Sequence, residues 1–169
     1  VTVSQLLLSL PVDPTNAVIK EAELITGYLM PALKTLFDDD GKHIRMRWMA
    51  TEPLDGSKST IASRWPDCLI TMYPEDTDDG VNIGYGEAKR ESERRNHYLI
   101  NQDLIRLALF TKKTVDDTSF DTSASLAIHA IGATLTFYLL KIQADGLYIM
   151  TELAHLDVPM AVSEIPSFL

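Results

Sequence analysis

The sequence predicts an α/β fold in which α-helices flank a central mixed β-sheet. Apolar residues recur at helical spacing in residues 15–37 and again in residues 97–113. Between these segments lie three runs with the alternation, or the β-branched and aromatic content, of strands, at residues 43–50, 65–73 and 81–89. A helix, three strands and a second helix are therefore expected in that order along the chain.

The two helices are expected to face the sheet in different ways. The apolar stripe of the first helix is centred on Val18, Leu29 and Leu36, which fall on one side of an ideal helix at about 100° per residue. The second helix is apolar over much of its circumference, so it is expected to be well buried.

The last third of the chain predicts three further strands. Residues 125–153 read as a strand, a bend at Gly132, a second strand, a turn at Ala144-Asp145-Gly146 and a third strand. The last two of these strands form a C-terminal β-hairpin. A buried helix over residues 126–142 remains the alternative from the sequence alone.

Composition is typical of one globular domain spanning residues 1–169, with 46% hydrophobic and 23% charged residues. The first residue is not Met, which leaves open that the domain belongs to a longer protein. No apolar run approaches the roughly 18 residues of a membrane span, so no membrane partner is expected. The single cysteine, Cys68, excludes an internal disulfide and indicates an intracellular location.

The net charge of −9 counts against strong nonspecific binding of nucleic acid. Basic residues nevertheless gather on both sides of residues 66–84, in the stretches 41–65 and 85–115. They predict either a local positive surface or ordinary solvated side chains on strand and helix exteriors.

Between these basic stretches, Pro66-Asp67 is followed by Glu87-Ala88-Lys89. Asp67 and Glu87 each lie ten residues from Thr77, the centre of the turn that joins their strands. Residues equidistant from a hairpin turn face each other about 5 Å apart, and alternation puts Lys89 on the same face as Glu87. Because like charges placed opposite one another destabilise a sheet, stability alone would not select this pair.

A divalent cation would turn the two carboxylates into a binding site. Mg²⁺ or Mn²⁺ takes carboxylate oxygens as ligands and completes its shell with water and substrate phosphate. The cation polarises a phosphoryl oxygen and acidifies a bound water, while Lys89 could orient that water or stabilise developing negative charge. The alternative is that Asp67 and Glu87 pair with Lys89 or with neighbouring arginines and bind no metal.

These residues resemble the motif of the PD-(D/E)XK nuclease superfamily, and the resemblance covers roughly residues 16 to 132, including the order of helices and strands. It implies a restriction-endonuclease-like core that hydrolyses phosphodiester bonds of DNA or RNA. It also implies Asp67 and Glu87 as metal ligands and Lys89 as the catalytic lysine. Since fold does not fix function, a catalytically inactive interaction module on the same fold is the alternative. Such a module could form a homodimer through its C-terminal strands.

Many members of this superfamily add a carboxylate from the first helix. Glu21 lies about 60° from the apolar stripe, whereas Glu23 falls on the opposite side. Glu21 is therefore the expected third metal ligand. Its alternative role is that of a boundary residue whose carboxylate reaches water.

The basic and polar residues after the motif are candidates for binding nucleic acid. Arg90, Arg94 and Arg95 follow Lys89 closely and could contact phosphates, although Glu91 and Glu93 among them offer local ion pairs instead. Tyr98, Gln102 and Arg106 recur every four residues on the second helix. That polar stripe either faces the nucleic acid or faces solvent. The four histidines, at positions 43, 97, 129 and 155, are widely separated and are expected to be structural.

Overall fold

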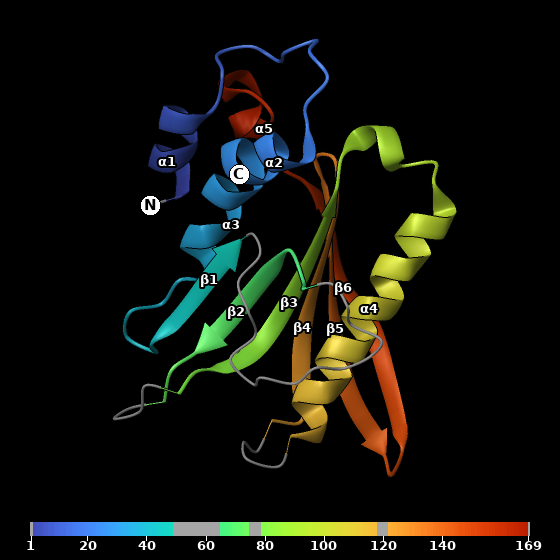
Figure 1. Cartoon of the computed structure of the whole chain (residues 1–169). Helices are drawn as coiled ribbons and strands as arrows, with labels where there is room; N and C mark the ends of the chain where they lie inside the picture. Colours follow the sequence, from blue (N-terminus) through green and yellow to red (C-terminus); the bar gives the residue numbers. More distant parts are fainter. Residues whose placement is uncertain (1, 49–64, 75–78, 118–121, 169) are drawn as a thin grey trace.

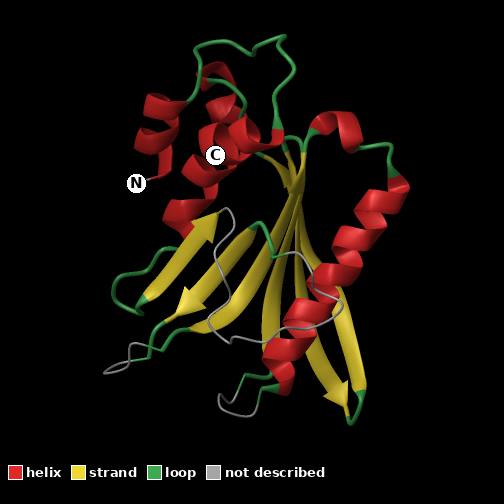
Figure 2. Ribbon diagram, in the orientation of Figure 1, coloured by secondary structure: helices red, strands yellow, loops and turns green. Residues whose placement is uncertain are grey.

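The computed structural model describes residues 2–48, 65–74, 79–117 and 122–168. It confirms the α/β class: a mixed six-stranded open sheet has helices packed against it (Figures 1 and 2). The strands are β1 (Ile44–Trp48), β2 (Cys68–Met72), β3 (Val81–Lys89), β4 (Ala124–Ile131), β5 (Thr134–Ala144) and β6 (Leu147–Asp157).

The strand order follows the chain, from β1 to β6. Every neighbouring pair is antiparallel except β3 and β4, which run parallel. A parallel pair needs a long crossover, and helix α4 (His97–Asp116) supplies it. The predicted C-terminal hairpin is confirmed as β5–β6, and the alternative of a helix over residues 126–142 is wrong. Gly132, with a φ of +57°, lies in the turn that separates β4 from β5.

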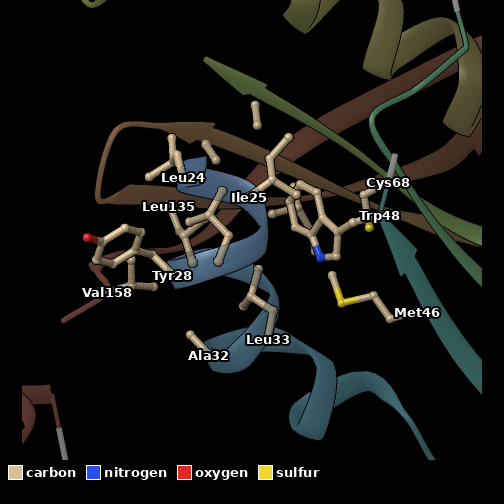
Figure 3. Close-up of a cluster of buried hydrophobic side chains, with 14 of the residues drawn as sticks. Leu24, Ile25, Tyr28, Ala32, Leu33, Met46, Trp48, Cys68, Leu135 and Val158 are labelled. Carbon is tan, nitrogen blue, oxygen red and sulfur yellow. The ribbon is translucent and has the colours of Figure 1, made fainter. Parts of the chain in front are cut away.

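Helices cover opposite faces of the sheet. The N-terminal segment consists of α1 (Thr2–Ser9), α2 (Glu21–Leu24), a π-helical turn η1 (Ile25–Leu29) and α3 (Met30–Phe37). Its apolar side chains contact the face that carries Cys68 and Ile128 (Figure 3). Leu107 of α4 packs on the other face, against Leu69 and Tyr85. The remaining helical turns are η2 (Glu91–Glu93), η3 (Val162–Glu164) and α5 (Ile165–Phe168). No helix of the described ranges is long and apolar enough to cross a membrane.

The first predicted helix begins six residues later than expected, at Glu21, and is not uniform. The amide of Met30 donates to the carbonyl of Ile25, five residues back, which is the hydrogen bond of a π-turn. Pro31 has no amide to donate to the preceding turn, so the regular α-helical ladder is interrupted there. The π-turn contains one residue more than an α-helical turn. This rotates the positions after it by about 100° relative to a straight α-helix. The predicted stripe is wrong at both ends, for different reasons. Val18 is 79% exposed because the helix begins only at Glu21, and Leu36, beyond the π-turn, is 60% exposed.

Helix α4 is buried on one side only, which corrects the prediction that it is well buried. Its buried residues are Asp103, Leu107, Thr111 and Thr114, a single stripe at helical spacing. Tyr98, Ile105 and Leu109 are exposed. The apolar content of its sequence is spread around the helix, but the sheet contacts only the face that carries Asp103.

Close strand contacts explain the glycine at position 86. A Cβ atom there would lie 2.8 Å from the Cβ of Cys68, its cross-strand partner. We expect Gly86→Ala to lower the free energy of unfolding by about 2 kcal/mol, because the strands must shift to admit the methyl group. Gly27 is the matched control, since a Cβ there has nothing within 4 Å. Gly27→Ala should raise the free energy of unfolding by about 0.5 kcal/mol in urea denaturation; equal effects at the two positions would contradict the packing argument.

Candidate functional site

The two motif carboxylates meet where β2 begins and β3 ends. Cys68 pairs with Gly86, and the same register continued by one residue places Asp67 opposite Glu87, as the hairpin geometry predicts. Asp67 precedes the strand, and its Oδ2 atom accepts a hydrogen bond of 2.8 Å from the amide of Ala88. Because Cys68 points into the core beneath the N-terminal helices, Asp67 lies on the face that α4 covers.

Glu87 is the most unusual residue of the site, because it is an acidic residue whose side chain is only 1% exposed. Oε1 lies 2.8 Å from Nη2 of Arg106 on α4. Oε2 has no hydrogen-bond or ion-pair partner within the described residues. Burial raises the pKa of Glu87 to about 9; Asp67 adds to the effect, and Arg106 opposes it only in part.

Lys89 lies on the same face, two residues further along β3. Its Nζ atom is 3.1 Å from Oδ2 of Asp103 and 4.0 Å from Oε2 of Glu21, and it donates to the carbonyl of Ala88 at 3.0 Å. Burial by itself lowers the pKa of this amine, but the charge of Asp103 and its hydrogen bond raise the pKa above the ordinary value. Lys89 is therefore held in its charged form.

The first-helix carboxylate near this cluster is Glu21. It lies at the first position of α2, half exposed and within reach of Lys89. Partial burial raises its pKa, Lys89 lowers it, and Asp67 raises it further. Glu23, on the other side of the helix, is exposed.

Two further buried polar residues lie in this cluster: Asp103, which sequence reasoning missed, and His129, which is expected from the sequence only to be structural. Asp103 is 3% exposed and lies 3.2 Å through Oδ1 from Nη1 of Arg106, as well as 3.1 Å from Lys89. His129 of β4 is 4% exposed and lies opposite Glu87 in the parallel register, with no partner for Nε2 among the described residues. Burial lowers the pKa of His129, so the ring is neutral at pH 7. An acid one turn before Leu107, at the spacing of the buried stripe, was the available signal for Asp103.

The predicted nucleic-acid-binding residues divide between the interior and the surface. Arg106 does not face solvent, because its guanidinium contacts Glu87, Asp103 and the carbonyl of Trp65 at 3.2 Å. Gln102, by contrast, is exposed and donates to the hydroxyl of Tyr98 at 2.7 Å.

The three arginines after the motif also differ from one another. Arg90 forms an ion pair with Glu93 at 2.9 Å. Arg94 pairs with Glu91 and donates to the carbonyl of Ile131 and to Thr134 Oγ1, which ties it to the β4–β5 turn. Arg90 and Arg94 therefore form the local ion pairs that were the alternative to phosphate contacts for this stretch. Arg95 is exposed. Of the three arginines, it is the one without an ion pair or hydrogen bond to another described residue that would compete with a phosphate.

The donor atoms of the cluster suit a hard divalent cation more than a soft one. The described residues contain no group of three His, Cys, Asp or Glu side chains already arranged around a metal position. The available oxygens are those of Asp67, Glu21 and the unpartnered Oε2 of Glu87. A buried carboxylate oxygen without a partner, beside a second carboxylate, is a position that a cation would stabilise.

Comparison with known proteins does not assign this site. No protein-family model, curated protein or solved structure matches the chain.

Proposed function

We propose that this domain hydrolyses phosphodiester bonds of nucleic acid with the help of Mg²⁺ or Mn²⁺. The observation that carries the proposal is a buried Glu87 whose Oε2 atom is unpartnered and whose pKa is affected by burial and by the charges of both Asp67 and Lys89. The register of Cys68 with Gly86, continued by one residue, places Asp67 opposite Glu87. A buried, unpartnered carboxylate oxygen is costly to stability, and a binding site for a cation gives it a role.

The topology supports a restriction-endonuclease-like core. A helix precedes the antiparallel strands β1, β2 and β3; α4 then crosses over, and β4 runs parallel to β3. This order of elements, a helix, three strands, a helix and a further strand, is the one that the resemblance to the PD-(D/E)XK superfamily implies, with the motif at its second and third strands. Strands β5 and β6 extend the sheet beyond that core.

In the proposed reaction, Asp67, Glu87 and Glu21 would hold the cation, and the chemistry it would supply is polarisation of a phosphate oxygen and acidification of a bound water. Lys89 is already charged and held by Asp103, so it can orient the water or stabilise charge that develops on the phosphate oxygens. Arg95 and Gln102, exposed beyond the cluster, are the candidates for contacting the nucleic-acid backbone.

The test is cleavage of labelled single- and double-stranded DNA and RNA with Mg²⁺, with Mn²⁺ and with a chelator. Asp67→Asn and Lys89→Met should each lower the cleavage rate by at least about 100-fold, because each removes a charge that acts in the transition state. Asp145→Asn and Lys141→Met are matched controls at exposed positions of the β5–β6 hairpin and should cut at the wild-type rate. Failure of the wild type to cut any substrate, or full activity of either site variant, would refute the proposal.

A non-catalytic interaction module is the second candidate, and one observation favours it. Strand β6 is an edge of the sheet and exposes Leu147, Ile149 and Leu153. An exposed edge with apolar side chains could pair with the same edge of a second copy. If this is the function, the isolated protein should be a dimer by light scattering, Leu153→Lys should make it monomeric, and Asp67→Asn should change neither result.

A further inference from the structure

Asp103 contacts both Lys89 and Arg106 in the ionic cluster, although it does not belong to the motif. It lies on the buried stripe of α4, one turn before Leu107, where it faces the sheet. Its two carboxylate oxygens contact different cations: Oδ2 is 3.1 Å from Nζ of Lys89, and Oδ1 is 3.2 Å from Nη1 of Arg106. One side chain therefore fixes the positions of two basic groups.

Arg106 contacts both segments that bear the motif carboxylates, β3 and the residues just before β2. Its Nη2 atom lies 2.8 Å from Oε1 of Glu87 on β3 and donates at 3.2 Å to the carbonyl of Trp65, two residues before Asp67. Neither oxygen of Glu87 has a hydrogen-bond partner among the described residues, but Oε1 forms the ion pair with Arg106, so Oε2 is the oxygen without a charged partner there. A planar guanidinium holds a fixed geometry between its partners, so Arg106 sets which way the Glu87 carboxylate turns.

We propose that Asp103 is the positioning residue of this site: it aims Lys89 directly and, through Arg106, orients the Glu87 carboxylate toward a bound cation. The inference rests on the proposed function, and it adds residues of α4 that the motif does not contain. Partners that orient metal ligands in this way commonly change metal affinity or activity by about 10- to 100-fold when they are removed.

A purely structural role is a weaker explanation of the same contacts. A buried ion pair contributes little net stability compared with well-packed apolar residues, and Leu107 shows that the next position of the stripe accepts a leucine. Asp103 instead places an acid against both basic residues of the cluster.

The experiment compares Asp103→Asn, Asp103→Glu and Asp116→Asn in two measurements: Mn²⁺ binding by calorimetry without substrate, and cleavage kinetics. Asp116 is the matched control, since it lies on the same helix and pairs with Lys112 and Tyr148 at the surface. For Asp103→Asn we expect kcat to fall by about 50-fold with KM within about threefold, and Mn²⁺ to bind about tenfold more weakly. Asp103→Glu, which keeps the carboxylate, should recover most of both losses.

Wild-type kcat and Mn²⁺ affinity in Asp103→Asn would overturn the inference while leaving the proposed function intact, even if the melting temperature fell. A wild type that neither binds Mn²⁺ nor cuts nucleic acid would overturn the proposed function and the positioning role with it. If Asp103→Asn does not fold, Arg106→Lys tests the same link, because a lysine cannot hold Glu87, Asp103 and the Trp65 carbonyl in one plane. It should weaken Mn²⁺ binding about tenfold, and unchanged binding would overturn the inference.

Discussion

Replacing Glu87 with glutamine is expected to stabilise the metal-free protein by about 3 kcal/mol at pH 7. The pKa of Glu87 is raised to about 9 in the folded protein, first by burial and then by Asp67, against an ordinary value of 4.5. At pH 7 the folded protein therefore holds a proton that the unfolded chain releases, and holding it costs free energy. Glutamine has the shape of the protonated acid and does not ionise, so the variant avoids this cost.

Because the pKa of Glu87 is raised on folding, the contribution of this residue to stability decreases as the pH rises. A carboxyl whose pKa is higher in the folded than in the unfolded state favours folding most below pH 4.5, and that contribution is lost as the pH rises toward 9. The wild type should therefore lose about 1.4 kcal/mol per pH unit relative to Glu87→Gln over this range. The two proteins should be almost equally stable near pH 4.

Thermal and urea unfolding at pH 4, 5.5, 7 and 8.5, in the presence of a chelator, measures both effects. Glu152→Gln is the matched control, because Glu152 is an exposed glutamate on β6. That control should follow the wild-type curve at every pH. A Glu87→Gln protein that is less stable than the wild type at pH 7 would show that the ion pair with Arg106 outweighs the burial of the acid.

The hairpin register could be predicted from the sequence because it depends on local rules. Alternation along β3 and equal distances from the turn were sufficient to place Glu87 opposite Asp67 and on the face of Lys89. The irregular step in the register lies between Ile70 and Thr71, nearer to the turn. It leaves the pairing of Cys68 with Gly86 where the sequence places it.

The helical parts of the site were harder to predict because they depend on contacts distant in sequence. The π-turn before Pro31 changes the phase of the first helix, so the residues beyond it no longer follow an ideal wheel. On α4, the sequence alone indicates apolar residues over much of the circumference and one polar stripe of Tyr98, Gln102 and Arg106. The sheet contacts the stripe of Asp103 and Leu107, which turns Arg106 inward and leaves Gln102 outside.

The buried acid of this cluster, Glu87, lowers the stability of the metal-free protein but is required for the proposed binding of a cation. The stability is lowered because the acid is buried, and the same burial would make its carboxylate a more effective ligand for a cation. An interaction module that no longer bound metal would gain stability by losing this acid, which is why the response of Glu87 to metal distinguishes the two candidate functions.

Affinity for Mn²⁺ is expected to rise about 100-fold between pH 6 and pH 8. A cation would bind the ionised form of Glu87, and below a pKa of about 9 the ionised fraction grows tenfold with each pH unit. A bound cation would also offset the repulsion from Asp67 that helps to raise this pKa. Calorimetric titration at pH 6, 7 and 8, in buffers of different ionisation enthalpy, should show about one proton released per Mn²⁺ bound.

The same titration of Glu87→Gln tests whether the carboxylate of Glu87 binds the cation. This variant should be the more stable protein without metal, yet bind Mn²⁺ about 100-fold more weakly than the wild type at pH 8, because an amide oxygen replaces the carboxylate. Its remaining affinity should change little with pH over this range. If instead Mn²⁺ leaves the melting temperature of the wild type unchanged at pH 8, the buried acid serves only its ion pair with Arg106, and the interaction module becomes the function to pursue.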